Sequence, residues 1–245
     1  MATILDANAL SSGIKLSPDM EQYPEGIIVP IDKPYEWTSA DVVRKLKFLS
    51  QRFFKNRKLK IGHAGTLDPL ATGVLLVCIG KATKLAESLQ AEKKEYIAGV
   101  RFGATTPCYD LEKEVDATYP YEHITEEGLR KALKEFEGEQ DQIPPLFSAK
   151  LINGKRAYEY ARAGEEKEMK PAHINIYATE LLKYEAPDSL IRVECSKGTY
   201  IRSFARDLGL TMESGAHLYS LERTVSGQFN VKNCIKVEDF ETFLK

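Results

Sequence analysis

The stretch GHAGTLDPLATGVLLVCIG, Gly62 to Gly80, places a single acid, Asp68, at the start of an apolar run. An Asp-Pro pair often does no more than open a turn. Here, however, Gly62, Gly65 and Gly73 surround the acid, and each allows close approach of the backbone or a positive φ. A carboxylate in such a loop could act as a nucleophile, as a general base or as the electrostatic partner of a cationic transition state. We therefore predict a ligand-facing loop whose reactive group is Asp68.

Other kinds of chemistry find less support in the sequence. Glycosidase-type chemistry needs two carboxyl groups across the bond. The acids nearest to Asp68, namely Asp41 and Glu87, lie in helical patterns without glycines around them, although folding could bring a more distant acid close. The four histidines show neither HExxH nor HxxxH spacing, and the four cysteines form no CxxC pair. We expect no metal and no other cofactor.

The composition is that of an ordinary soluble globular protein, with 43% apolar and 29% charged residues in a chain of 245. No apolar run approaches the roughly 20 residues that span a bilayer. The N-terminus has no basic region followed by an apolar one, so it is not a secretory signal. Together with the widely spaced cysteines, this predicts a cytoplasmic protein with reduced thiols and no membrane association.

Charge is distributed unevenly along a chain whose net charge is only −2. Residues 41–60 carry eight Lys or Arg and one acid, whereas residues 109–141 carry eleven acids and four bases. A local basic face is what phosphate binding requires. A charge run of this kind is also typical of a solvated amphipathic helix, and charge alone does not separate the two interpretations.

The hydrophobic pattern predicts more strands than helices. A basic helix capped by Thr38 or Ser39 should bury Val42 and Leu46, and Thr125 should cap an acidic helix. The strands are often joined without a full helical crossover, which favours an α+β fold with a mixed, largely antiparallel sheet flanked by helices. The predicted strands are 25–34, 74–79, 94–104, 174–185 and 189–198, and further helices are predicted at 82–89 and 198–209.

The loop GHAGTLDPLATGVL resembles the catalytic-loop motif of the TruB family, the bacterial tRNA pseudouridine-55 synthases. Four other stretches agree in order and character: VPIDKPYEWTS, KKEYIAGVRFG, CSKGTYIRSFARDLG and GAHLYSLERT. The segment QIPPLFSAKLINGKRAYEYARAG, with its turn-like Asn153-Gly154, is similar to the family's mobile RNA-clasping segment. The resemblance extends from about Gly26 to Thr224 and implies the pseudouridine synthase fold.

The resemblance also implies roles for individual residues. Asp68 matches the catalytic aspartate, Tyr96 the tyrosine that lies against the uracil ring and is implicated in proton transfer, and Arg202 the arginine paired with the aspartate. An opposing charge would keep Asp68 ionised in a pocket poor in water. The expected substrate-binding residues are His63, which fills the space left by the extruded nucleotide, Leu221, which lines the base pocket, and Gly65 and Thr66 in the loop.

The implied reaction is isomerisation of uridine 55 in the T-loop of tRNA to pseudouridine, which gains and loses no atoms and so requires no cofactor. Base flipping costs on the order of a few kcal/mol, and stacking on Tyr96 could return roughly 1–3 kcal/mol. The basic helix from Arg44 and the segment Lys150–Arg162 would hold phosphates of the tRNA T-arm. A non-catalytic RNA-binding protein and a hydrolase that releases free base are the alternatives. We expect a monomer.

The expected domain organisation is a catalytic domain at 26–224, including an RNA-clasping insertion at about 142–170. Residues 1–25 should be an N-terminal extension, loosely ordered unless it docks on the domain. Residues 225–245 should be a short tail, too short for the PUA domain that follows in many relatives. One departure from the family pattern is Glu36, which stands where glycine is usual, so that a positive φ there would be strained.

Overall fold

The computed structural model describes residues 1–148, 150–152, 154–165 and 167–245. They form two compact units, one made of residues 1–96 and 222–245 and the other of residues 97–221. The chain passes from one unit to the other within β5 (Lys94–Phe102) and returns within β13 (Ala216–Ser226). The domain boundaries expected at 25/26 and 224/225 stay predictions.

The first unit is built around β4, whose residues from Val74 to Ile79 are all at most 1% exposed. β4 pairs antiparallel with β2, from Ile27 opposite Ile79 to Lys33 opposite Gly73. The predicted strands at 25–34 and 74–79 are therefore confirmed. β3 was not among the predicted strands, and it is a strand because it pairs with β4. The bounds are β1 (Thr3–Ile4), β2 (Ile27–Lys33), β3 (Ile61–Ala64), β4 (Ala71–Ile79) and β14 (Phe229–Asn230).

The basic helix of the first unit is α2 (Ser39–Phe53), and its start is the predicted one. The Thr38 side chain accepts a hydrogen bond from the Asp41 amide, and the Asp41 carboxylate accepts one from the Thr38 amide, which together form a capping box. Val42 and Leu46 are fully buried, so the apolar face lies inward and the basic face outward. The helix predicted at 82–89 is present as η2 (Gly80–Leu85) followed by α3 (Ala86–Ala91).

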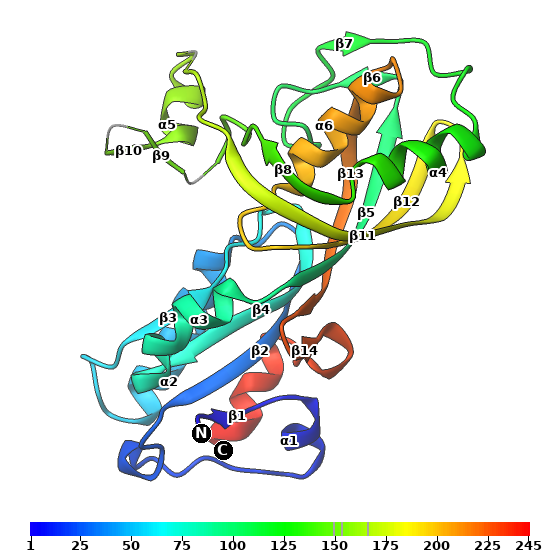
Figure 1. Cartoon of the computed structure of the whole chain (residues 1–245). Helices are drawn as coiled ribbons and strands as arrows, with labels where there is room; N and C mark the ends of the chain where they lie inside the picture. Colours follow the sequence, from blue (N-terminus) through cyan, green and yellow to red (C-terminus); the bar gives the residue numbers. More distant parts are fainter. Residues whose placement is uncertain (149, 153, 166) are drawn as a thin grey trace. The chain divides into compact units, whose positions relative to one another are not determined.

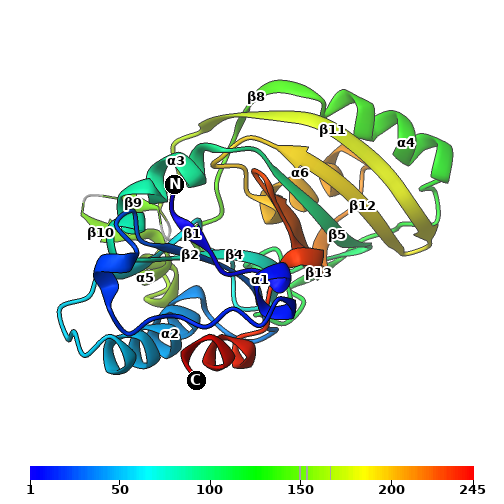
Figure 2. The same ribbon diagram turned by 90° about the horizontal axis from the view of Figure 1, so that it is seen from below.

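Both ends of the chain are docked on the first unit. β1 pairs parallel with β2, Leu5 is fully buried, and the Leu16 amide donates to the Phe243 carbonyl over 2.7 Å. The N-terminal extension is thus ordered, because it docks. Figures 1 and 2 show α2 beside the C-terminal helix η4, whose Phe240 is fully buried. The remaining bounds are α1 (Ala7–Ser11), η1 (Met20–Gln22), η3 (Val231–Asn233) and η4 (Glu238–Leu244).

The second unit is an antiparallel sheet covered by helices (Figure 1). Its strands follow the order β5-β12-β11-β8, and β11 pairs antiparallel with both β12 and β8. α4 packs against β11, Thr125 caps α4 as predicted, and the rings of Phe136 and Phe204 meet edge to face at 5.3 Å. The bounds are β6 (Ala104–Thr105), β7 (Ala117–Thr118), α4 (Glu126–Glu135), β8 (Gly138–Gln142), β11 (Ala172–Glu185), β12 (Asp188–Cys195) and α6 (Ile201–Thr211).

The predicted RNA-clasping insertion contains a short hairpin and a helix: β9 (Leu151–Ile152), β10 (Lys155–Arg156) and α5 (Ala157–Arg162). Two tyrosines of α5 carry cations over their rings: Arg162 lies 5.2 Å from the Tyr158 centroid, and Lys155 lies 5.9 Å from that of Tyr160. Of the predicted turn, Asn153 lies outside the described residues, whereas Gly154 has a φ of +82°.

The predicted fold class is confirmed, since β4 pairs antiparallel with β2 and β3, β11 pairs antiparallel with β12 and β8, β1 pairs parallel with β2, and helices flank the strands. Among the described residues, no helix combines the length and the apolar character needed to cross a bilayer.

Glu36 adopts a φ of 64°, the left-handed conformation that the family's usual glycine would adopt without strain. The left-handed region costs a residue with a side chain about 1–2 kcal/mol, and glycine returns about 0.5–1 kcal/mol of this through its freer unfolded state. We expect Glu36→Gly to raise the free energy of unfolding by about 0.5–1 kcal/mol in urea titrations. The control is Glu25→Gly, an exposed turn residue without a positive φ, which should lower that free energy. Stabilisation of both variants or of neither would contradict the strain at Glu36.

Candidate active site

Asp68 lies in the loop that joins β3 to β4, in the first unit. The Ala71 amide donates to the Asp68 carbonyl over 3.1 Å, which closes the turn before β4. The Ser39 hydroxyl, at the start of α2, accepts from the Leu67 amide at 2.9 Å and donates to the Leu67 carbonyl at 3.0 Å. The loop is therefore attached to α2 on one side and continues into the central strand on the other.

The glycines around Asp68 serve different purposes. Gly65 and Gly73 have φ values of +88° and +94°, as the sequence led us to expect. Gly62 has no such φ, and a Cβ added to it would meet nothing within 4 Å. Gly62 lies in a regular part of β3 opposite Cys78, and a close approach of its backbone to a ligand stays a prediction.

Arg223, on β13, is hydrogen-bonded to the Asp68 loop and to the start of β4. Its side chain is 2% exposed and donates three hydrogen bonds to main-chain carbonyls: Nε to Val74 at 2.7 Å, Nη2 to Gly65 at 3.2 Å and Nη1 to Thr66 at 3.5 Å. A Cβ on Gly73 would lie 2.3 Å from the Arg223 carbonyl oxygen, so only glycine fits there. Sequence reasoning missed this residue, and its only signal was an arginine in the apolar pattern of a strand.

Lys33, at the end of β2, is fully buried and joins the loop to the turn before α2. Its Nζ donates to the carbonyls of Pro34 at 2.8 Å and Pro69 at 3.1 Å, and also to that of Trp37. Burial lowers the pKa of Lys33 to about 8, and the negative charge of Asp68 opposes this shift. The charges of Lys33 and Asp68 therefore stabilise each other.

His63 and Tyr96 also belong to the first unit. His63 lies in β3 opposite Val77, and its pKa is lowered by burial and then by the charge of Arg223, so its ring is neutral at neutral pH. Tyr96 is 9% exposed in β5, on the face whose Ala98 and Val100 are fully buried, as the strand pattern predicted. The roles expected for both stay predictions.

Arg202 lies in the second unit, on α6, and is buried rather than a surface cation. Its Nε lies 3.5 Å from a carboxylate oxygen of Asp110, which is itself 5% exposed. Nη1 donates to the Cys108 carbonyl at 3.2 Å and Nη2 to the Phe147 carbonyl at 2.8 Å. Asp110 was not recognised in the sequence, because it is one of eleven acids at 109–141 and only its burial distinguishes it.

The base of the predicted clasp is attached to the helix that carries Arg202. Gln142 donates through Nε2 to the Tyr200 carbonyl at 3.1 Å and accepts through Oε1 from the Tyr200 amide at 2.8 Å. The Ser203 hydroxyl donates to the Ile143 carbonyl at 2.8 Å. Residues 142–147 are therefore positioned by the same element that positions Arg202.

The predicted site residues thus form two groups. His63, Gly65, Thr66 and Asp68 lie together in the first unit, where Arg223 and Lys33 support them. Arg202 forms the second group with Asp110, and Leu221 lies half-buried in β13, at the end of the second unit.

Comparison with known proteins identifies the family of the chain. Residues 51–201 match the model of the TruB family pseudouridylate synthase N-terminal domain. The chain belongs to this family. It is 52% identical over 222 residues to a tRNA pseudouridine synthase B of Phocaeicola vulgatus, covering 91% of the chain and 94% of the relative. It is 50% identical over 226 residues to that of Flavobacterium johnsoniae, covering 92% and 99%.

The fold is also found among solved structures. The crystal structure of a Cbf5–Nop10–Gar1 complex matches 92% of this chain, and 60% of its own, with 31% identity and a TM-score of 0.68. The range that matches the TruB family contains Asp68 and Tyr96 and ends one residue before Arg202. The segment that matches the family model therefore includes the Asp68 loop.

The buried charge of Lys33 should make stability depend on pH. Its pKa is about 8 when folded and near the ordinary 10.5 when unfolded, so the unfolded chain binds more protons between these values. Below pH 8 Lys33 is charged in both states, so the folded state carries the full free-energy cost of burying the charge. This cost decreases as the pH rises towards 10.5, because the folded state then loses the proton first. Relative to Lys33→Met, the wild-type free energy of unfolding should therefore rise over this range, by at most about 1.4 kcal/mol per pH unit. Urea titrations at several pH values measure this difference, and Lys232→Met, at an exposed lysine, is the control. A free-energy difference that falls as the pH rises would contradict a buried, charged Lys33.

Arg223→Lys keeps the charge, but a single ammonium nitrogen cannot occupy the three separate positions from which Nε, Nη1 and Nη2 donate. Each buried carbonyl left without a donor costs about 1–3 kcal/mol, so we expect the free energy of unfolding to fall by at least that amount. Arg101→Lys is the matched control, because Arg101 is exposed and pairs with Asp188 at the surface, where such a change costs at most about 1 kcal/mol. Equal losses in the two variants would argue against Arg223 as the anchor of the loop.

Proposed function

We propose that this protein isomerises uridine 55 in the T-loop of tRNA to pseudouridine, with Asp68 as the catalytic carboxylate. The proposal depends above all on one observation: the acid of the family motif is retained on a loop held by a buried arginine. The relatives named tRNA pseudouridine synthase B, about half identical in sequence, supply the substrate class.

The reaction needs few protein groups, and Asp68 and Tyr96 supply the main ones. The N1–C1′ bond breaks, the uracil turns, and C5 bonds to C1′ while one proton leaves C5 and one is gained at N1. Asp68 can form an adduct at C1′ or remove the 2′ proton and open a glycal route. Tyr96 lies against the ring and assists the proton transfer, in the role that its place in the family motif implies.

In this mechanism Arg202 pairs with Asp68 and keeps it ionised. Support comes from the way Arg202 is held: Asp110 and two main-chain carbonyls fix its guanidinium, which leaves its direction little freedom. Asp110 acts as a positioning residue, because it neutralises part of a buried charge that would otherwise be costly.

The RNA contacts follow from charge and position. The outward face of α2 and the clasp at 142–170 carry exposed cations, which bind phosphates without reading sequence. His63, neutral at neutral pH, occupies the space that the flipped uridine leaves, and Leu221 lines the pocket that receives the base. Gly65 and Thr66 present the loop backbone to the nucleotide.

The test is incubation with an unmodified tRNA transcript, followed by mapping of pseudouridine by base-specific chemical labelling. We expect product at position 55 with the wild type. Asp68→Asn should lower its rate by at least about 10²–10⁴-fold while RNA affinity is retained, because the carboxylate acts in the chemical step. The control is Asp19→Asn, at an exposed turn acid of the first unit, which should leave the rate unchanged.

Two outcomes would overturn the proposal. Binding of the tRNA without product in either form would assign the protein to the non-catalytic RNA-binding class. Release of free uracil would assign it to hydrolases, since an isomerase returns the base to the same sugar.

A further inference from the structure

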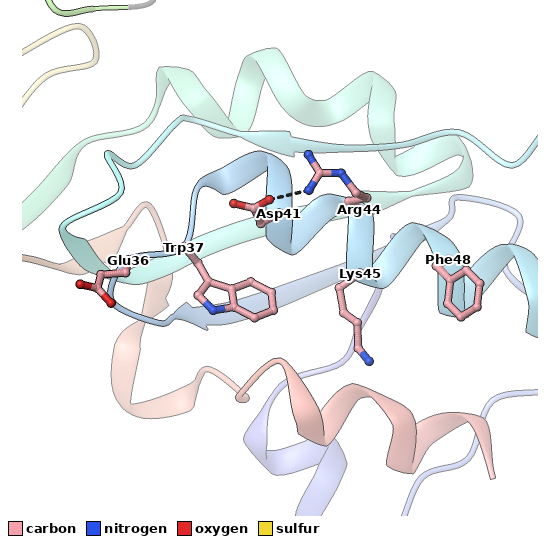
Figure 3. A pocket seen from close by; sticks show the side chains of 6 residues that line it. All are labelled: Glu36, Trp37, Asp41, Arg44, Lys45 and Phe48. Carbon is pink, nitrogen blue, oxygen red and sulfur yellow. Dashed lines mark hydrogen bonds and ion pairs between the residues drawn. The ribbon is translucent and has the colours of Figure 1, made fainter.

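A surface hollow of about 550 Å³ lies along α2, on the helix whose outward cations are proposed above to bind phosphates. Figure 3 shows the side chains that line it: Glu36, Trp37, Asp41, Arg44, Lys45 and Phe48. Two of them are large aromatic groups open to solvent, with Trp37 37% and Phe48 63% exposed. Exposed apolar groups gathered in one hollow are typical of a binding surface.

The hollow is attached to the catalytic loop by direct hydrogen bonds. The Lys33 ammonium group donates both to the carbonyl of Trp37 and to that of Pro69, the residue after Asp68. Ser39 bonds both main-chain groups of Leu67, the residue before Asp68. The main chain of Trp37 therefore lies next to the main chain of the Asp68 loop.

The lining offers a partner for each part of a nucleotide. The flat Trp37 and Phe48 rings can stack on a base. Lys45 and Arg44 are 43% and 74% exposed, and each pairs at the surface with an acid, Lys45 with Glu241 at 3.3 Å and Arg44 with Asp41. Exposed ion pairs of this kind are weak, so a phosphate can replace the carboxylate partner. Glu36 is exposed at the rim and can accept a hydrogen bond from an exocyclic amine of a base. An anionic lipid surface has phosphates but no base edge that would use this acid.

The backbone strain at Glu36 also supports a binding role for the hollow. A side chain at φ 64° costs free energy that a glycine would not, and strain of this kind is concentrated at functional sites. A ligand contact by the Glu36 carboxylate explains why a residue with a side chain occupies this strained position.

We propose that this hollow binds an unpaired nucleotide of the RNA substrate that flanks the flipped uridine. Its base stacks on Trp37, its phosphate meets Lys45 and Arg44, and Glu36 favours a base with an exocyclic amine over uracil. This inference rests on the proposed function, because it takes the substrate to be an RNA bound at Asp68.

Trp37 is the single tryptophan of the 245 residues, so tryptophan emission reports on this hollow directly. We would titrate the wild-type chain with an unmodified T-arm stem-loop RNA and follow emission beside an independent label on the RNA. Quenching that saturates with the RNA label is the expected result. Unchanged emission at RNA saturation would overturn the proposal, as would quenching by anionic vesicles or by raised protein concentration but not by RNA.

Substitutions in the hollow measure how much it contributes to RNA affinity. Trp37→Ala should weaken RNA binding by about 5- to 150-fold, the equivalent of roughly 1–3 kcal/mol for one stacked base. Trp37→Phe keeps a ring and should recover much of this loss, and Tyr177→Ala, at an exposed aromatic residue of β11, should change nothing. Glu36→Gly should lower affinity for loops with an amine-bearing base beside the target, but not for loops with uracil there. Equal affinity of the wild type, Trp37→Ala and Glu36→Gly would refute the assignment.

Failure here is separable from failure of the proposed function. Suppose that the wild type forms pseudouridine, but RNA does not change the Trp37 emission and the Trp37→Ala and Glu36→Gly variants bind RNA as the wild type does. Only the present inference is then refuted. If emission is quenched by RNA but no pseudouridine forms, the proposed function falls, and the hollow remains an RNA-binding surface.

Discussion

The Asp68 loop depends on one buried guanidinium, that of Arg223. A charge taken out of water is costly unless polar groups replace the lost hydration. Three main-chain carbonyls do so here, and in turn the arginine fixes the backbone at Gly65, Thr66 and Val74. Because Arg223 comes 149 residues after Val74, the loop that carries the acid is held by the far end of the chain. Gly73 completes the arrangement, since any side chain there would collide with the arginine's own backbone.

The same solution recurs around other buried cations. Lys33 donates to three carbonyls in the first unit, and Arg202 donates to two in the second, where Asp110 also faces it. A carbonyl is a good partner for this purpose because it accepts strongly without carrying a charge of its own. Loops that have no regular secondary structure are thereby held in single conformations, which is what a preorganised catalytic site requires.

Glu36 shows where stability and binding oppose each other. The chain keeps a side chain in a backbone conformation that glycine would adopt without strain, beside an exposed tryptophan whose carbonyl is tied to the catalytic loop. A protein selected for stability alone would lose this residue readily. Its presence is understandable if the surface it belongs to contacts substrate.

Local sequence determined much of this protein. We could predict the Thr38 and Thr125 caps, the inward face of α2, the alternation in β5 and the loop around Asp68. Each of these features depends on the spacing of residues within a short stretch of the chain. The strand character of β3, the docking of both termini, and the burial of Lys33, Arg202 and Arg223 were decided only by the tertiary structure. A lysine or arginine has the same appearance in sequence whether it is solvated or buried. Only the carbonyls and carboxylates that folding brings around it, from distant parts of the chain, make burial possible.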